Sequence, residues 1–239
     1  MSTIAIIPAR GGSKRIPHKN IKVFAGLPII AHSIRAARKT GVFDRIIVST
    51  DSNEIAEIAG QHGAEVPFRR PAALADDLTG TDAVIVHALN WLAEHDSRAG
   101  HACCIYATAP FVRPEDIRLG LKMLREQGAS TAISVTTYPY PISRSLKRND
   151  RGRVEMIWPE NYPKRSQDLP EVFHDAAQFY WYDVEKYMRE QRMFSSDTIP
   201  VPIPRHLVQD IDTPEDWEVA ERMFAAAGLA PGSTDGSNR

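Results

Sequence analysis

The stretch TIAIIPARGGSKRIPHKN, residues 3–20, passes abruptly from apolar residues to glycine and positive charge. Its first part, residues 3–9, is rich in β-branched residues and almost continuously apolar, which is typical of a strand buried on both faces. Its second part contains four cations and no acidic residue: Arg10, Lys14, Arg15 and Lys19. Ligands of open parallel sheets bind beyond the carboxyl ends of the strands, so the stretch predicts a first strand that leads into an anion-binding loop.

Short apolar runs and amphipathic segments alternate through the rest of the chain. Further strands are expected at residues 45–51, 101–110, 130–138, 176–183 and 198–204, and helices at residues 29–40, 52–63, 81–95, 113–128, 184–192 and 213–228. With 239 residues, 43% of them hydrophobic, the chain can bury the core of one domain. The alternation predicts the α/β class: a three-layer, Rossmann-like fold around a mostly parallel sheet.

The alternation stops at residue 139. Residues 139–175 contain several prolines and scattered aromatic residues, so we expect an arm with a hairpin around NDRGR, residues 149–153, followed by an extended segment. The predicted organisation is a single domain over residues 1–228 with this arm inserted, followed by a disordered tail at 229–239.

Charge is distributed unevenly along the sequence. Residues 1–43 carry eight cations and no acid, so with an overall net charge of −1 the rest of the chain carries −9. A nucleic-acid-binding module usually has a basic pI, whereas this pI is about 6.7, so a small polyanion is the expected ligand. No long apolar segment or secretory signal is evident, and Cys103 and Cys104 are adjacent, which favours a cytoplasmic protein without disulfides.

The cationic loop has the chemistry of a phosphate site. Gly11 and Gly12 lack Cβ atoms, so their amides can approach a phosphate closely and adopt positive φ angles. Arg10 can bind two phosphate oxygens at once, while Lys14 acts as a mobile point charge. The spacing excludes the Walker A and G-x-G-x-x-G loops. A solvated loop without a ligand is disfavoured, because no acid in the loop offsets its cations.

A longer pattern includes this loop. IPARGGSKRIPHKN, residues 7–20, closely resembles the P-A-R-x-G-S-K-x-x-P-x-K-N signature of the cytidylyltransferases that activate nine-carbon 2-keto sugar acids. Further segments that agree are residues 46–71, 106–117, 164–181 and 209–217. The resemblance implies a nucleotidyltransferase fold and Mg²⁺-dependent transfer of CMP from CTP to the anomeric hydroxyl of such an acid, with release of pyrophosphate.

The resemblance also implies the nucleotide site. Its expected residues are Arg10, Gly11, Ser13, Lys14, Asn20, Arg70 and Thr81. Arg10, Lys19 and Asp212 are the expected catalytic residues, and Lys19 would neutralise charge on the leaving pyrophosphate. Arg70 and Thr81 are expected near the cytosine and ribose, although Thr81 could also serve as the N-cap of the following helix.

Asp210 and Asp212 are candidate magnesium ligands. If their segment is extended, both carboxylates point to the same side, and they offer the hard oxygen ligands that Mg²⁺ prefers. The resemblance implies the same assignment. Alternatively, Asp212 lies just before the closing helix, where its negative charge interacts favourably with the positive end of the helix dipole. Asp51 is a rival acidic residue that we expect to cap the helix after it.

For the sugar acid, Arg165 is preferred over Lys164 as the carboxylate ligand, because a guanidinium binds a carboxylate with two hydrogen bonds. Gln178 and Tyr180 alternate along a predicted strand and are expected to contact the sugar, and His174–Asp175 is expected to be structural or to contact it. The resemblance carried by the segment VFHDAAQFYW, residues 172–181, implies pseudaminic acid as the acceptor. Sialic and legionaminic acids remain alternatives.

The resemblance further implies that the arm reaches a second subunit, so a homodimer is expected, with Arg165 acting in its own or in the neighbouring site. CTP and the sugar acid are the expected partners, without nucleic acid or membrane. Rival functions are an eight-carbon-sugar cytidylyltransferase, a hexose-phosphate nucleotidyltransferase and a nucleic-acid-binding module. The last would show salt-sensitive DNA binding and no pyrophosphate release.

Overall fold

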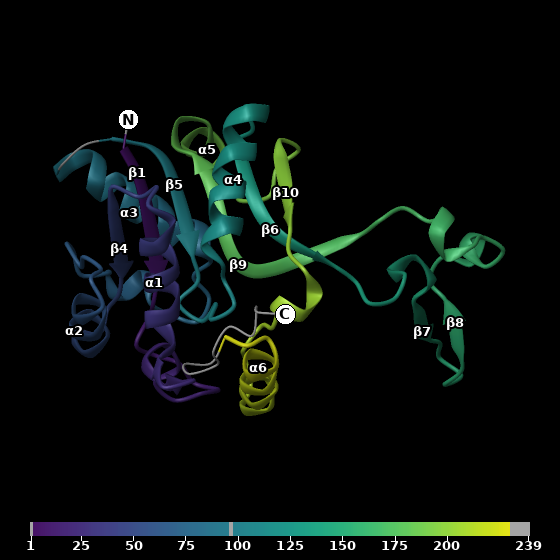
Figure 1. The fold of residues 1–239 in the computed structure, drawn as a ribbon. Coiled ribbons are helices and arrows are strands. Elements are labelled where there is room, and N and C mark those ends of the chain that lie inside the picture. The colour runs from purple at the N-terminus through teal and green to yellow at the C-terminus, as the bar shows by residue number, and fades with distance from the viewer. Residues whose placement is uncertain (1, 96–97, 230–239) are drawn as a thin grey trace, which may run out of the picture.

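A six-stranded sheet forms the centre of the molecule (Figure 1). The structure, a computed structural model, describes residues 2–95 and 98–229. The sheet contains β1 (Ser2–Pro8), β4 (Arg45–Ser49), β5 (Ala99–Ile105), β6 (Thr131–Thr137), β9 (Phe173–Asp183) and β10 (Thr198–Pro202). Their order is β10-β6-β9-β5-β1-β4, and only β9 runs antiparallel to its neighbours in this sheet. The predicted mostly parallel sheet is thereby confirmed.

Helices cover both faces of this sheet. Those on one side are α1 (Ile29–Thr40), α2 (Asn53–Gln61), α4 (Pro114–Gln127) and, at its end, α6 (Pro214–Ala226); those on the other are α3 (Thr81–His95) and α5 (Val184–Glu190). Strand residues alternate between the two resulting cores, so Cys103 packs under α1 and α4 whereas Cys104 packs under α3. The expected three-layer α/β fold is confirmed.

Local sequence signals explain where the helices begin and end. Pro114 occupies the first turn of α4, and Gly128 ends it with a φ of 59°. Thr213 and Asp216 form the predicted capping box of α6. Within α4, Gly120 is required for close packing on the sheet, because a Cβ atom there would lie 2.7 Å from the Trp181 ring.

The sequence did not predict the smaller elements. They are the hairpin of β2 (Val23–Phe24) and β3 (Leu27–Pro28) and the 3-10 turns η1 (Lys19–Ile21), η2 (Ala72–Leu74), η3 (Ile142–Arg144), η4 (Pro159–Asn161), η5 (Ser166–Asp168) and η6 (Arg205–Leu207). The hairpin packs between α6 and α1, because the Phe24 ring meets Trp217 and Phe224 of α6 and His32 of α1 edge to face.

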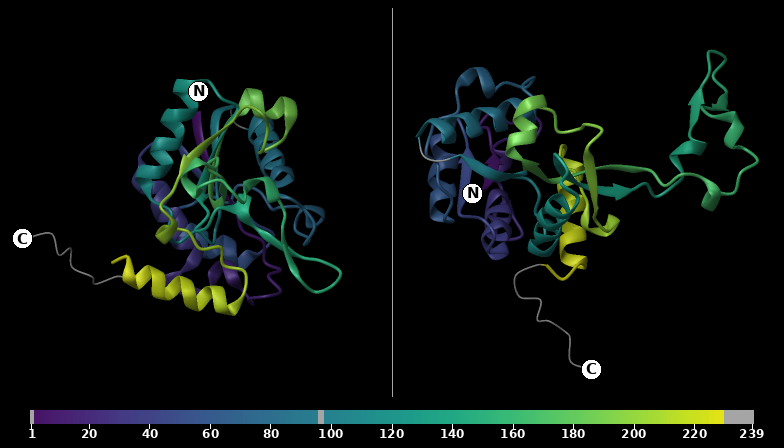
Figure 2. Two further views of the ribbon diagram at one scale, coloured as in Figure 1. Left: turned by 90° about the vertical axis from the view of Figure 1, so that its right-hand side faces the viewer. Right: turned by 90° about the horizontal axis from the view of Figure 1, so that it is seen from above.

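The segment between β6 and β9 projects far from the body (Figures 1 and 2). It contains the antiparallel pair β7 (Leu146–Arg148) and β8 (Val154–Met156), so the predicted hairpin around residues 149–153 is confirmed. Of the predicted tail, all but Leu229 lies outside the described residues. No helix in the described part of the chain is long and apolar enough to cross a membrane.

Candidate active site

A cavity of about 570 Å³ opens at the carboxyl end of β1, where the sequence placed the ligand loop. Four parts of the chain line it: the loop after β1, the η2 segment with the start of α3, the residues after β5, and Asp212 before α6. The structure brings these sequence-predicted site residues to the cavity: Arg10, Ser13, Lys14, Lys19, Asn20, Arg70, Thr81 and Asp212. The walls therefore carry several fixed cations and polar donors beside a few apolar side chains.

The two glycines of the loop differ from the prediction in their φ angles, and the Gly11 amide differs in its hydrogen-bond partner. Neither Gly11 nor Gly12 has a positive φ angle. The Gly11 amide donates to Asp51 Oδ1 at 2.8 Å, so it is not free for a phosphate in this structure. A Cβ atom on Gly11 would lie 3.1 Å from the Ser52 Cβ, a tight contact, so glycine favours the close approach to the start of α2.

Asp51 was predicted to cap α2, and this is wrong. Ser52 is the N-cap, since its hydroxyl accepts a hydrogen bond from the Ile55 amide at 3.4 Å. The Asp51 carboxylate instead turns back to the loop after β1. Asn20 closes the same loop by donating from Nδ2 to the Arg10 carbonyl at 2.9 Å. These contacts fix the path of the loop without using its cationic side chains.

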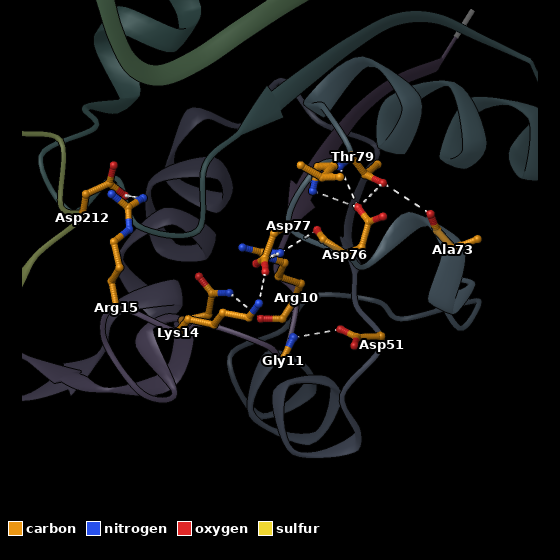
Figure 3. A network of polar contacts seen from close by, with 12 residues as sticks. Arg10, Gly11, Lys14, Arg15, Asp51, Ala73, Asp76, Asp77, Thr79 and Asp212 are labelled. Atoms are coloured by element: carbon orange, nitrogen blue, oxygen red, sulfur yellow. Dashed lines mark hydrogen bonds and ion pairs between the residues drawn. The ribbon is translucent and has the colours of Figure 1, made fainter.

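The cations of the loop are partnered by acids from distant parts of the chain (Figure 3). Arg10 Nη1 lies 2.7 Å from the Asp77 carboxylate and donates to the Asp76 carbonyl at 2.5 Å. Lys14 also pairs with Asp77. The interpretation that no acid offsets the loop is thus wrong, because folding brings in residues far along the sequence.

Asp212 closes the opposite side of the cavity. Arg15 Nη2 and Lys19 Nζ lie 2.9 and 3.3 Å from its Oδ1, and Lys19 also donates to the Ile211 carbonyl at 2.6 Å. Thr213 and Asp216 cap α6, so Asp212 does not serve as the cap. The N-terminal loop and the segment before α6 are therefore held together by charge.

Asp210 and Asp212 have the chemistry of a magnesium site. Ile211 between them is fully buried, whereas both aspartates are reached by solvent. The surrounding protein and then the Asp212 carboxylate raise the pKa of Asp210, which means that two like charges lie close together. No group of three or more metal-ligating side chains occurs in residues 2–95 and 98–229. A pair of carboxylates suits Mg²⁺, which usually keeps water and substrate phosphates as its other ligands.

Arg70 lies below the cavity as a buried cation, with 4% of its surface exposed. Its Nε donates to the Ser49 hydroxyl at 3.1 Å, and its Nη2 donates to the Ser49 carbonyl. Burial lowers the pKa of Arg70 to about 10, so the side chain still carries its charge at neutral pH. The guanidinium therefore places a fixed positive charge against this part of the cavity.

Thr81 is the first residue of α3, and its hydroxyl shares a 2.8 Å hydrogen bond with the Tyr106 hydroxyl. It therefore does not act as the N-cap that was the alternative. Burial raises the pKa of Tyr106 to about 12, so this hydroxyl stays protonated. The sequence analysis assigned no role to Tyr106 or Thr108, although both follow β5 at the edge where parallel strands place ligands.

The structure does not bring the three predicted sugar-binding residues to the cavity. Gln178 is buried and donates to the Leu207 carbonyl at 2.6 Å, and its Oε1 finds no partner among the described residues. Tyr180 is also buried and donates to the Asp175 carboxylate at 2.8 and 2.9 Å. Both lie on β9, which has a strand on each side, so the core and neighbouring segments take up these side chains.

Arg165, the third of these residues, lies on the projecting arm (Figure 1). It pairs with Asp168 of the same arm at 2.8 Å, and Lys164 bonds to Asn161. The His174 ring contacts the Asp175 carbonyl at 2.9 Å instead of its carboxylate, so these residues form no acid–base dyad. Within one chain, Arg165 therefore lies outside the lining of the cavity.

Comparison with known proteins gives consistent results. The family model described as cytidylyltransferase matches residues 4–222. The chain is 38% identical to pseudaminic acid cytidylyltransferase of Campylobacter jejuni, covering 94% of this chain and 97% of that protein. It is 32% identical to CMP-N,N'-diacetyllegionaminic acid synthase of Legionella pneumophila, with the same coverage.

A solved structure of CMP:2-keto-3-deoxy-manno-octonic acid synthetase complexed with CTP covers 95% of this chain and 100% of its own, with a TM-score of 0.68 and 18% identity. At that identity the likeness concerns the fold. The match along most of the chain and the close relatives together establish that this chain belongs to the cytidylyltransferase family.

Proposed function

We propose that this chain transfers CMP from CTP to the anomeric hydroxyl of a nine-carbon 2-keto sugar acid, with pseudaminic acid as the acceptor, and releases pyrophosphate. The observation that carries the proposal is the cavity after β1, in which Arg10, Lys14 and Lys19 surround a space that a nucleotide can enter. The relative from Campylobacter jejuni supports pseudaminic acid, and the relative from Legionella pneumophila supports legionaminic acid as the alternative.

The residues of the cavity suggest how they act on CTP. Arg10 and Lys14 bind oxygens of the phosphate chain, and the Ser13 hydroxyl adds a donor between them. Lys19, held between the Ile211 carbonyl and Asp212, sits ready to stabilise the negative charge that develops on the departing pyrophosphate. Arg70 and the Thr81–Tyr106 pair lie at the part of the cavity proposed for the nucleoside. Phosphoryl transfer depends chiefly on such positioning and charge stabilisation.

We further propose that Asp210 and Asp212 hold Mg²⁺ together with the phosphates of CTP. The ion would shield the triphosphate from the negative charge of the incoming sugar acid. Burial and then the negative charge of Asp212 raise the pKa of Asp210, and a divalent cation held by the two carboxylates would favour their charged forms, which supports the assignment. In this structure, the positive charges of Arg15 and Lys19 partly neutralise the Asp212 carboxylate.

The experiment combines the protein with CTP, Mg²⁺ and, in turn, pseudaminic, legionaminic and sialic acids, and measures pyrophosphate. We expect the highest kcat/KM with pseudaminic acid and little reaction when UTP replaces CTP. A clear preference for sialic acid would contradict the proposed acceptor. Absence of pyrophosphate release with every acid would contradict the proposed function itself.

A homodimer is the proposed state of the protein, and a cytoplasmic location is proposed with it because both cysteines are free thiols. The arm exposes large apolar side chains: Tyr140, Leu146, Val154, Ile157 and Tyr162. The arm has no core of its own that could bury them, so a second copy of the chain would cover them. Arg165 would then reach the neighbouring site. Light scattering at micromolar concentration that shows a monomer would contradict this state.

A further inference from the structure

One carboxylate, that of Asp77, lies where the phosphates are expected. It contacts Arg10 at 2.7 Å and also pairs with Lys14, the two cations proposed for the phosphate chain (Figure 3). Hydrogen bonds from Lys14 and then Arg10 hold the pKa of Asp77 below its ordinary value, so the group is charged at neutral pH. Asp77 therefore presents an anion to the same two donors that a phosphate would use.

The turn that carries Asp77 is held in place by its own contacts. The Asp76 Oδ1 accepts hydrogen bonds from the amides of Leu78 and Thr79 at 3.0 and 2.7 Å, and from the Thr79 hydroxyl at 2.7 Å. The Asp76 carbonyl accepts from Arg10. These bonds leave the Asp77 carboxylate free of the turn and directed at the cations, as in Figure 3.

The pairs of Asp77 are open to water, so an incoming anion can exchange with them. The side chain of Lys14 is 80% exposed and that of Asp77 is 39% exposed. Exposed ion pairs are weak, and each contributes at most a few-fold in an equilibrium constant. A triphosphate can therefore displace Asp77, but the displacement lowers its apparent affinity.

We propose that Asp77 competes with the phosphate chain for Arg10 and Lys14, and that it thereby weakens the binding of pyrophosphate and speeds its release. The inference rests on the proposed function, because pyrophosphate is the product of that reaction. Asp77 lowers the affinity of CTP as well, but CTP also has proposed nucleoside contacts that Asp77 does not touch, whereas pyrophosphate has only the phosphate donors. Asp77 thus makes tight binding of a ligand depend on contacts with the nucleoside as well as with the phosphates.

The test is calorimetric titration of inorganic pyrophosphate, and separately of CTP, into the wild-type protein and the Asp77→Asn variant at fixed ionic strength. We expect pyrophosphate to bind the variant about three- to tenfold more tightly, the range for one or two exposed ion pairs. A variant that merely damages the loop would bind more weakly. Equal or weaker binding of pyrophosphate by Asp77→Asn would overturn the inference.

Two further variants isolate the contact. Asp76→Asn removes the same charge one residue away, keeps the oxygen that holds the turn, and is expected to change pyrophosphate affinity less than twofold. Asp77→Glu keeps the carboxylate and is expected to bind pyrophosphate nearly as the wild type does. If Asp76→Asn increased the affinity for pyrophosphate as much as Asp77→Asn does, the increase would come from the loss of any nearby negative charge. That result would overturn the inference. If the wild type binds no CTP, the proposed function fails. If it binds CTP but Asp77→Asn does not bind pyrophosphate more tightly, only this inference fails.

Discussion

The body and the arm of the molecule differ in how far their apolar side chains are buried and their charged side chains are paired. In the body, apolar residues fill two cores on either side of the sheet, and the cations of the loop after β1 find acids such as Asp77 and Asp212 in the same chain. The arm leaves Val154 and Tyr162 largely exposed, and its Arg165 does not line the cavity. We therefore propose that one chain supplies the nucleotide half of the site, whereas the exposed side chains of the arm are covered by a second copy.

The largest expected effect belongs to the body. Replacement of Lys19 by alanine should lower kcat/KM about 100- to 1000-fold, because it removes a preorganised positive charge next to the leaving pyrophosphate. The proposed dimer should persist, since the Lys19 ammonium donates to Ile211 and Asp212 of its own body. Steady-state kinetics and light scattering measure the two properties. The matched control is Lys122→Ala on the exposed face of α4. Comparable activity of Lys19→Ala and this control would contradict the assignment.

A change in the arm is expected to weaken the proposed dimer and to leave the body folded. Val154→Asp places a charge in the exposed apolar patch, so we expect the dimer to dissociate about 10- to 100-fold more readily while the body stays folded. Sedimentation over a range of concentrations gives the dissociation constant, and thermal unfolding reports on the body. Phe194→Asp, at an exposed position of the body, serves as the control. Dissociation by the control but not by Val154→Asp would place the interface elsewhere.

Mixing two inactive proteins sharpens the comparison further. Lys19→Ala disables the site of its own body, and Arg165→Ala disables the proposed contribution of its own arm to the partner. Random reassortment gives half mixed dimers, each with one intact site, so activity should return to about one quarter of the wild-type value. Activity that stays at the level of the separate variants would mean that Arg165 does not act across the interface.

The smallest expected effect concerns packing in the body. Gly120→Ala introduces a Cβ atom 2.7 Å from the Trp181 ring, and such overpacking typically costs about 1–3 kcal/mol of unfolding free energy. Urea denaturation should show a lower midpoint, with no change in the dimer constant or in CTP binding. Gly80→Ala, where no atom lies within 4 Å, is the control. An unchanged midpoint for Gly120→Ala would mean that helix α4 shifts freely.

Local signals in the sequence predicted most elements of the body. Helical spacing and the terminal Gly41 gave the bounds of α1, and the loop motif identified the residues that gather at the cavity. The pairing of Asp77 with Arg10 was not predictable, because it joins residues far apart in sequence. The burial of Gln178 and Tyr180 was not predictable for a similar reason. The strand pattern does not reveal that β9 lies in the middle of the sheet, where its side chains are buried.

The most direct test of the account is a crystal structure of the protein with CTP. We predict phosphate oxygens on Arg10, Ser13 and Lys14, with the Asp77 carboxylate moved away from both cations. A nucleotide bound elsewhere, with Asp77 still paired to Arg10 and Lys14, would contradict the central claim that this cavity binds the triphosphate.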